Sequence, residues 1–415
     1  MNRSTCVHSR RPAGLARAAF ALLLSAAFPP TSAAGPDLVP VVSVEGMGGQ
    51  FFFQGENTSF SGNAAWQATP GLKFSKRFSL LPTASGRYQR TREVQELIGG
   101  GFLTRENLEN TATLKGILAL NDSWKLKLKG SARSQLLVES DDEDLGKGLF
   151  DNVIVGMGLE AERSGKRLRS LRFSLDPYAV RFPHYNSLAS GSSFGSEIDS
   201  GENTLDFNAY DATAAADLGL GKSAFASAML LGSYRLFTDQ KIVTDSGLFT
   251  DSKRKDWYGA AALGLARVLP EWSALGLRTL VGFDATASLL DSDQSNYDAS
   301  RNRFNPDYYD YLELGIAPKV LGRFKKGVEW SLVYGFTRRS YSDRPVQSAD
   351  GNYLADPIRL DTHTVSGSVK VPLAKGFAAV ARGAWRRATS NMQFEQTYRY
   401  NYHSEHYFTG ISWDY

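Results

Sequence analysis

Two short motifs in this sequence match patterns that carry chemistry in enzymes. Gly191-Ser192-Ser193-Phe194-Gly195 fits the G-x-S-x-G pattern of a nucleophilic serine, which requires a sharp strand-to-helix turn. Here the pattern lies in a polar segment rich in glycine and serine. Gly221-Lys222-Ser223 resembles the end of a phosphate-binding loop, but Ala216 stands where that loop requires its first glycine. Neither motif therefore predicts a catalytic site.

Histidine and cysteine are too scattered to indicate a metal or redox centre. The one cysteine is Cys6, so the chain beyond it can form neither a disulfide nor a zinc–thiolate site. His403 and His406 are three residues apart, which places them on opposite faces of a strand. His363 is the only candidate for a hydrolase with a Ser–His pair on an outer rim. We therefore expect no enzyme, no cofactor and no metal site.

Charged residues instead recur at alternate positions within apolar segments. From Trp124 to Gln135, apolar residues alternate with Lys125, Lys127 and Lys129, which is the two-residue period of a strand. Three cations on one strand face repel unless acids, water or a bound anion offset them. The same alternation assigns twelve basic and eight acidic side chains to polar strand faces: Arg87, Lys115, Lys125, Lys127, Lys129, Arg133, Arg172, Arg278, Lys319, Lys370, Arg382 and Arg386, against Glu45, Glu160, Glu162, Asp176, Asp206, Asp284, Glu313 and Glu329.

Strands with one apolar and one polar face must be positioned by a fold that satisfies both faces. After residue 35 there is no run of about 18 apolar residues, so no spanning helix is predicted. Alternating segments of about 10 to 15 residues are typical of a transmembrane barrel, which must close because lipid cannot bond free backbone groups. A soluble β-sandwich with scattered aromatics is the alternative.

The connections between the segments alternate between short and long, as expected for periplasmic turns and extracellular loops. Short connections are predicted at Ser75–Arg77, Asn121–Ser123, Ser164–Lys166, Gly219–Lys222, Leu269–Glu271, Lys325–Gly327 and Ala374–Gly376. Long ones are predicted at Gly55–Asn57, Glu93–Glu106, Ser140–Gly148, Val180–Asn203, Thr238–Lys255, Asp291–Pro306, Ser342–Pro357 and Met392–Thr397. This pattern predicts about 16 strands, within a range of roughly 14 to 18, with both ends in the periplasm.

The last segment carries the most specific pattern. Tyr415, Trp413, Ile411 and Tyr407 fall on one strand face at the C-terminus. This pattern resembles the assembly signal of Gram-negative outer-membrane β-barrel proteins, in which apolar residues alternate before a terminal aromatic, usually phenylalanine. The resemblance implies an all-β, membrane-spanning, antiparallel up-and-down barrel, porin-like and of no identified subfamily. It also implies three partners, namely outer-membrane lipid, lipopolysaccharide and the barrel assembly machinery.

Aromatic residues gather near the expected strand ends, as they do at membrane–water interfaces. Near the short turns lie Trp124, Trp272, Trp330 and Trp413. Near the long loops lie Trp257, Tyr258, Tyr308, Tyr309, Tyr341, Tyr398, Tyr400 and Tyr402. We expect two aromatic girdles.

Residues 1–34 read as a signal peptide, which leaves residues 35–415 as the barrel. Four arginines precede the apolar run Ala18 to Phe28, and small residues follow it. Removing those four from 47 basic residues leaves 43, against 43 acidic residues. A neutral mature chain offers no case for nucleic-acid binding, and the signal predicts export to the outer membrane.

A barrel of about 16 strands is too wide for side chains to fill, so an aqueous lumen is expected. The longest loop, Val180–Asn203, is the candidate for a constriction, because its tip at Ser187–Ser193 could bend inward; a surface loop is the alternative. The basic excess suggests a preference for anions, whereas neutralising cross-strand pairs are the competing interpretation. Acidic stretches at Ser140–Asp144 and Asp291–Asp293 either bind divalent cations or are solvated loop tips.

These features predict a porin-like channel for passive diffusion of small polar solutes or ions. The alternative is a non-conducting surface or assembly barrel, such as an adhesin, a receptor, or the outer-membrane part of a secretion or polysaccharide-export system. The pattern does not distinguish a monomer from a trimer, because every lipid-facing wall is apolar.

Overall fold

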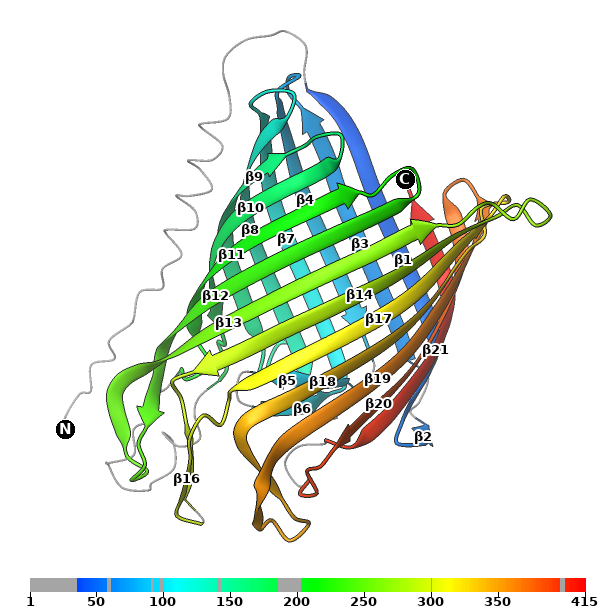
Figure 1. Cartoon of the computed structure of the whole chain (residues 1–415). Coiled ribbons are helices and arrows are strands. Elements are labelled where there is room, and N and C mark those ends of the chain that lie inside the picture. Colours follow the sequence, from blue (N-terminus) through cyan, green and yellow to red (C-terminus); the bar gives the residue numbers. More distant parts are fainter. Residues whose placement is uncertain are drawn as a thin grey trace, which may run out of the picture. The chain divides into compact units, whose positions relative to one another are not determined.

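Antiparallel strands that pair in chain order make up most of residues 38–415 (Figure 1). The computed structural model describes residues 36–57, 61–90, 93–97, 100–139, 143–185, 203–299, 301–395 and 400–415. The predicted signal peptide therefore lies outside the described residues. Within them, no helix is long and apolar enough to cross a membrane.

Sixteen strands of the described chain form the barrel wall. They are β1 (Asp37–Phe53), β3 (Ser61–Lys73), β4 (Phe78–Gln89), β7 (Glu106–Ala119), β8 (Trp124–Val138), β9 (Asn152–Arg163), β10 (Leu168–Arg181), β11 (Phe207–Gly219), β12 (Ala224–Val243), β13 (Phe249–Val268), β14 (Leu277–Ser292), β17 (Tyr311–Phe324), β18 (Glu329–Gln347), β19 (Tyr353–Ala374), β20 (Phe377–Ser390) and β21 (Tyr402–Asp414). Shorter strands in the connections are β2 (Glu56–Asn57), β5 (Glu93–Leu97), β6 (Gly100–Thr104), β15 (Asn296–Asp298) and β16 (Arg303–Asn305).

The wall closes on itself. The last strand, β21, pairs with β1 in register from Ser43↔Asp414 to Phe53↔Ser404, and β1 also pairs with β3. Closure leaves no wall strand with a free edge. The predicted all-β, antiparallel up-and-down barrel of 16 strands is confirmed.

Short connections gather at one end of the barrel, here called the turn end, and longer ones at the other, the loop end (Figure 1). The β19–β20 connection consists of Lys375 and Gly376, whose φ angles of 48° and 83° favour the type I′ turn of a two-residue hairpin. The seven short connections are residues 74–77, 120–123, 164–167, 220–223, 269–276, 325–328 and 375–376. Each contains or overlaps a predicted turn.

Two hairpins extend further than their sequence predicts. The expected loops Thr238–Lys255 and Ser342–Pro357 are largely strand, because only residues 244–248 join β12 to β13 and only residues 348–352 join β18 to β19. A two-stranded ribbon that projects into water has polar residues on both faces. Polarity alone therefore does not mark where such a strand ends.

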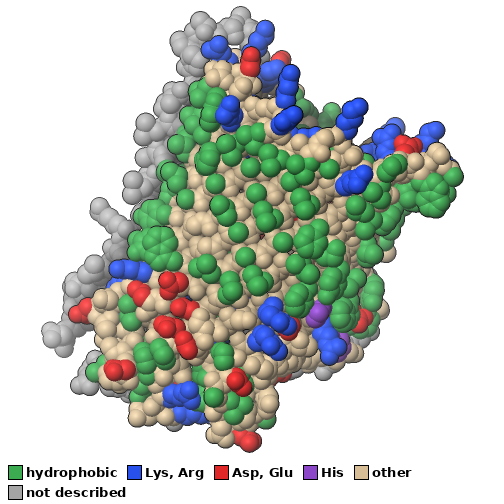
Figure 2. All heavy atoms as spheres, viewed as in Figure 1, with side chains coloured by type: hydrophobic (Ala, Val, Ile, Leu, Met, Phe, Trp, Pro, Cys, Tyr) green, Lys and Arg blue, Asp and Glu red, His purple; other side chains and the backbone are tan. Residues whose placement is uncertain are grey.

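The outer face of the wall is apolar. Leu175, Leu230 and Leu263 are 61%, 62% and 61% exposed, and Figure 2 shows a band of apolar side chains between two charged rims. An exposed apolar surface of this extent requires apolar surroundings. Transmembrane barrels carry such a band where the wall faces lipid.

Aromatic side chains border this band at both ends. At the turn end, Trp413 stacks on Tyr415 with 6.0 Å between ring centroids. At the loop end, Trp257 of β13 lies over Tyr234 of β12 at 4.4 Å, and Tyr210 of β11 is the outward-facing partner of Tyr234. These rings lie where the membrane–water interface is expected.

The expectation that every tyrosine near the long loops belongs to the outer girdle is wrong. Tyr258 follows the outward Trp257 directly and so faces the interior. Tyr400 and Tyr402 are 5% and 9% exposed and pack in buried clusters, while Tyr398 lies outside the described residues. Irregular segments have no period, so the direction of their side chains cannot be read from the sequence.

The seam between β1 and β21 depends on glycine at close approach. A Cβ atom on Gly410 would lie 1.9 Å from the carbonyl oxygen of Gly46, whereas a Cβ atom on Gly46 would meet nothing within 4 Å. We therefore expect Gly410→Ala to destabilise the closed barrel by about 1–3 kcal/mol through overpacking. The folded, heat-modifiable fraction on a gel should fall.

Gly46→Ala is the matched control at the same seam. It should keep the wild-type folded fraction, because its new methyl group points into open space. Equal behaviour of the two variants would contradict the close approach at the seam.

Candidate functional site

The inner face of the barrel is charged. On β9 the exposed Val155 and Leu159 lie on the outer face, so Glu160 and Glu162 face the lumen. The same alternation places these predicted side chains on the inner face: Arg87, Lys115, Lys125, Lys127, Lys129, Arg133, Arg172, Arg278, Lys319, Lys370, Arg382, Arg386, Glu45, Glu160, Glu162, Asp176, Asp284, Glu313 and Glu329. Asp206 lies in the connection before β11, where it accepts a hydrogen bond from the Phe182 amide.

The lysine run on β8 is largely neutralised by its neighbours. Lys127 Nζ lies 2.5 Å from Glu160 Oε1 and also pairs with Glu162, both on β9. Lys129 Nζ lies 2.8 Å from Asp176 of β10. Lys125 lies opposite Glu162, but the ion pair of Glu162 is with Lys127. Acids on β9 and β10 therefore offset most of the repulsion in this run.

Further ion pairs cross the inner wall, either between neighbouring strands or over one intervening strand. Arg382 binds Glu45 through two hydrogen bonds of 2.7 and 2.8 Å, which is the strong bidentate geometry. The remaining pairs are Arg133–Glu109, Arg172–Asp217, Lys319–Asp284, Arg323–Glu329, Arg339–Glu313 and Lys370–Asp414. Cross-strand neutralisation thus accounts for much of the charged inner wall.

Pairing leaves an excess of positive charge in the lumen. None of Arg87, Lys115, Lys125 and Arg386 forms an ion pair with a described residue. Glu109 lies opposite Arg87 and Glu162 opposite Lys125, but these acids pair with Arg133 and Lys127. Arg87 lines an inner-wall pocket of about 360 Å³ together with polar side chains of β1, β7 and β21. Lys115 is also the cross-strand partner of Lys129. These four cations are the inner-wall groups most available to a solute.

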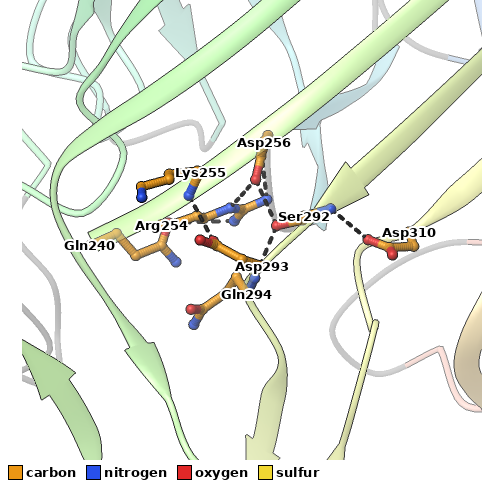
Figure 3. Close-up of polar contacts among 8 residues, drawn as sticks. All are labelled: Gln240, Arg254, Lys255, Asp256, Ser292, Asp293, Gln294 and Asp310. Carbon is orange, nitrogen blue, oxygen red and sulfur yellow. Dashed lines mark hydrogen bonds and ion pairs between the residues drawn. The ribbon is translucent and has the colours of Figure 1, made fainter. Parts of the chain in front are cut away.

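A buried ion pair lies at the loop end of β13 (Figure 3). Arg254 and Asp256 are both 0% exposed, and two hydrogen bonds of 2.8 and 3.0 Å join them. The Arg254 guanidinium also lies between the rings of Phe237 and Tyr309, at 4.6 and 4.4 Å from their centroids. Ser292 donates its hydroxyl to Asp256 at 2.6 Å. This fully partnered arrangement is what a buried charge requires.

A second buried arginine, on β18, is surrounded by tyrosine rings. Arg344 of β18 is 9% exposed and donates a hydrogen bond of 2.8 Å to the Tyr400 hydroxyl. Its guanidinium lies 4.5 Å from the Tyr308 ring and 5.1 Å from the Tyr341 ring. Such contacts combine cation–π attraction with exclusion of water.

One connection supplies a ring to each of these arginines. Tyr308 covers Arg344, and Tyr309 covers Arg254, so the end of this connection that precedes β17 is anchored to β13 and to β18 at the loop end. The predicted constriction at Val180–Asn203 lies mostly outside the described residues. Within the described chain, residues 293–310 are the connection that is tied to the inner wall by buried arginines.

Sequence reasoning did not identify Arg254 or Asp256. The run Lys253-Arg254-Lys255-Asp256 is polar throughout and resembles a loop. The signal was present, since Arg254, Asp256 and Tyr258 fall on one face in continuous alternation with Trp257. The alternation predicts a strand across this polar run only when it is given more weight than the polarity of the residues.

The three histidines singled out in the sequence lie on the barrel wall. His363 lies on the outer face, where its Nδ1 is 2.8 Å from the Tyr334 hydroxyl. His403 and His406 lie on opposite faces of β21. The described residues contain no group of three or more His, Cys, Asp or Glu placed to hold a metal ion, and this includes the acidic stretch Asp291–Asp293. The G-x-S-x-G motif lies outside the described residues.

A charged interior within an apolar exterior defines the architecture. The chain has the fold of an outer-membrane β-barrel. No family model matches the sequence, and no curated protein sequence matches it.

Solved structures of similar architecture cover nearly the whole chain at low sequence identity. OccD3 (OpdP) of Pseudomonas aeruginosa is 10% identical over 94% of this chain and 96% of its own, with a TM-score of 0.46. The anion-selective porin of Comamonas acidovorans is 8% identical over 92% and 100%, with a TM-score of 0.38. A bacterial polysaccharide outer membrane secretin is 8% identical over 91% and 98%, with a TM-score of 0.42. A shared fold does not transfer function among such barrels.

The buried Arg254–Asp256 pair supports a stability prediction. Arg254→Met leaves the Asp256 carboxylate buried without its partner, and we expect a loss of about 3–5 kcal/mol at the loop end. Hydrogen exchange of residues 293–310 should accelerate. The double variant Arg254→Met/Asp256→Leu should lose much less, because both charges are removed together. Equal losses of stability in the single and double variants would contradict the conclusion that Arg254 and Asp256 act as a pair.

The pH should also alter the stability of this connection. Burial, together with the nearby Asp291 and Asp307 carboxylates, raises the pKa of Asp310 to about 6. The folded protein therefore holds this proton more tightly than the unfolded chain does. The stabilisation is present below the ordinary pKa of 3.8 and is lost as the pH rises through 6.

Hydrogen exchange of residues 293–310, corrected for intrinsic rates, should thus show more protection at pH 5 than at pH 7. Asp310→Asn should reduce this difference, since its side-chain oxygen still accepts the Ser292 amide hydrogen bond. Burial also raises the pKa of Asp293, so a smaller pH effect should remain. Asp245→Asn, in the exposed β12–β13 connection, is the control. An undiminished pH effect in Asp310→Asn would rule out this carboxylate as its source.

Proposed function

We propose that this protein is an outer-membrane channel for passive diffusion of small polar solutes and ions, with a weak preference for anions. The observation that carries the proposal is the charged, polar inner wall inside an apolar outer band. A wall of 16 strands is wide enough for water to enter between its faces. Solutes would be sorted by size and by the local field, and no cofactor takes part.

The preference for anions rests on the charges that remain after pairing. Arg87, Lys115, Lys125 and Arg386 face the lumen and form no ion pair with a described residue. Glu109 and Glu162, the cross-strand neighbours of Arg87 and Lys125, pair with Arg133 and Lys127 instead. The lumen-facing Asp211 interacts with Arg235, so the two partly offset each other. A positive field within a narrow aqueous path raises the local concentration of anions.

A planar bilayer with a chloride gradient tests both parts of the proposal. The purified protein should give large, stable conductance and a reversal potential that favours chloride over potassium. Lys115→Gln/Lys125→Gln should reduce the chloride-to-potassium permeability ratio by about twofold, because two unpaired lumen cations are removed. Lys222→Gln, in the exposed β11–β12 turn, should leave the ratio unchanged.

A reversal potential that favours cations would remove the anion preference and leave the channel. A folded barrel that stays silent would remove the channel. The second candidate, a non-conducting surface or assembly barrel, would then be preferred. The anchoring of residues 293–310 to two arginines at the loop end favours this candidate, because it restrains a connection beside the lumen.

A further inference from the structure

Three arginines gather on the outer face of the barrel near the loop end. Arg338 of β18 is the cross-strand partner of Asp361 of β19, and Arg359 lies two residues before Asp361 on the same face. Arg387 of β20 is the partner of His363, and next to it on β21 lies His403. We call Arg338, Arg359 and Arg387 the outer arginine patch. It spans three adjacent strands, about 10 Å at the usual strand spacing.

The patch lies directly at the border of the apolar band. Closer to the turn end, the outward positions of β18 to β21 carry the half-buried Phe336 and Trp385 and the exposed Val365 and Tyr407. Figure 2 shows basic and histidine side chains gathered just below the apolar band on the right. Aromatic rings mark the interfacial layer, so the arginines lie at the depth of the lipid headgroups.

The patch keeps a net positive charge after its own ion pairs are formed. Asp361 binds Arg338 through hydrogen bonds of 2.7 and 2.9 Å and lies 4.0 Å from Arg359. Arg387 is exposed and has no carboxylate within ion-pairing distance in the described chain. Glu405 is the other acid on this part of the outer face. Three arginines therefore face two carboxylates, with two histidines beside them.

The patch is confined to one sector of the loop end. At the corresponding border on β11 to β14, the outward side chains are Tyr210, Tyr234, Trp257 and Asp291. Acidic side chains gather on that side in Figure 2. The outer arginine patch is therefore a local feature of the loop end, and basic residues do not surround the whole barrel at this level.

We propose that the outer arginine patch binds the phosphate groups of a phosphorylated glycolipid in the outer leaflet. The inference rests on the proposed membrane location. Arginine suits this role because its planar guanidinium binds phosphate oxygens in pairs, and basic side chains at the membrane surface attract anionic headgroups. Asp361 holds Arg338 and Arg359 side by side, and Arg387 offers a free guanidinium on the next strand.

The experiment measures the binding of bisphosphorylated lipid A to the full-length protein in detergent by native mass spectrometry. The variant Arg338→Gln/Arg359→Gln/Arg387→Gln should bind lipid A about tenfold more weakly. The matched control, Lys166→Gln/Lys222→Gln/Lys326→Gln, removes the same charge from three exposed turns and should bind like the wild type. Arg387→Gln alone breaks no ion pair and should weaken binding by about threefold, which keeps the test valid if the triple variant folds poorly.

Each other outcome overturns the proposal. Unchanged binding in both patch variants would exclude the arginines as the phosphate site. Displacement of lipid A by millimolar inorganic phosphate would assign the patch to free phosphate. Loss of an oligomer in the triple variant, with lipid A still bound, would assign the patch to contact with a second copy. Conductance measured on the same samples tests the channel separately, because lipid A binding in detergent does not depend on an open lumen.

Discussion

The pairing of β1 with β21 is the constraint on which the rest of the barrel depends. Every N–H and C=O group in a lipid-embedded wall must find a partner within the wall, because hydrocarbon offers none. Eleven consecutive register pairs, from Ser43↔Asp414 to Phe53↔Ser404, satisfy the two end strands. Once the seam is closed, each strand has one face toward the bilayer and one toward the lumen. The alternation of apolar and charged residues follows from this single requirement.

The two faces then follow different rules. Outside, large apolar side chains stay exposed and need no partner other than lipid. Inside, charges lie close enough to pair across neighbouring strands, as Lys127 does with Glu160 and Glu162. At the loop end the interior becomes drier, and Arg254 and Asp256 are completely enclosed. Charged side chains along the lumen therefore lie on an open wall. Those that are buried at the loop end must be fully paired.

Much of the architecture could be predicted because its signals are local. The seven short turns are marked by turn-forming residues, and the facing of Lys125 or Glu160 follows from a two-residue period. Which acid binds which lysine could not be predicted, since cross-strand partners depend on a register set by turn geometry.

Irregular segments were the least predictable part of the chain. Tyr308 and Tyr309 looked like members of an outer girdle, yet they pack on Arg344 and Arg254. A connection has no fixed period, so composition gives no direction for its side chains. The outer arginine patch was missed for another reason. Its members are far apart in sequence, and only the order of β18 to β21 brings them together.

Tyr308 and Tyr309 are neighbours in the chain, yet each packs on a different arginine. Their rings meet edge to face, with 5.2 Å between the centroids. A shift that lifted one ring would pull on the other through their shared peptide bond, which is rigid and planar. The two anchors are therefore mechanically coupled. Release of residues 293–310 from the wall would be a concerted step, with both guanidinium groups losing their cover at the same moment.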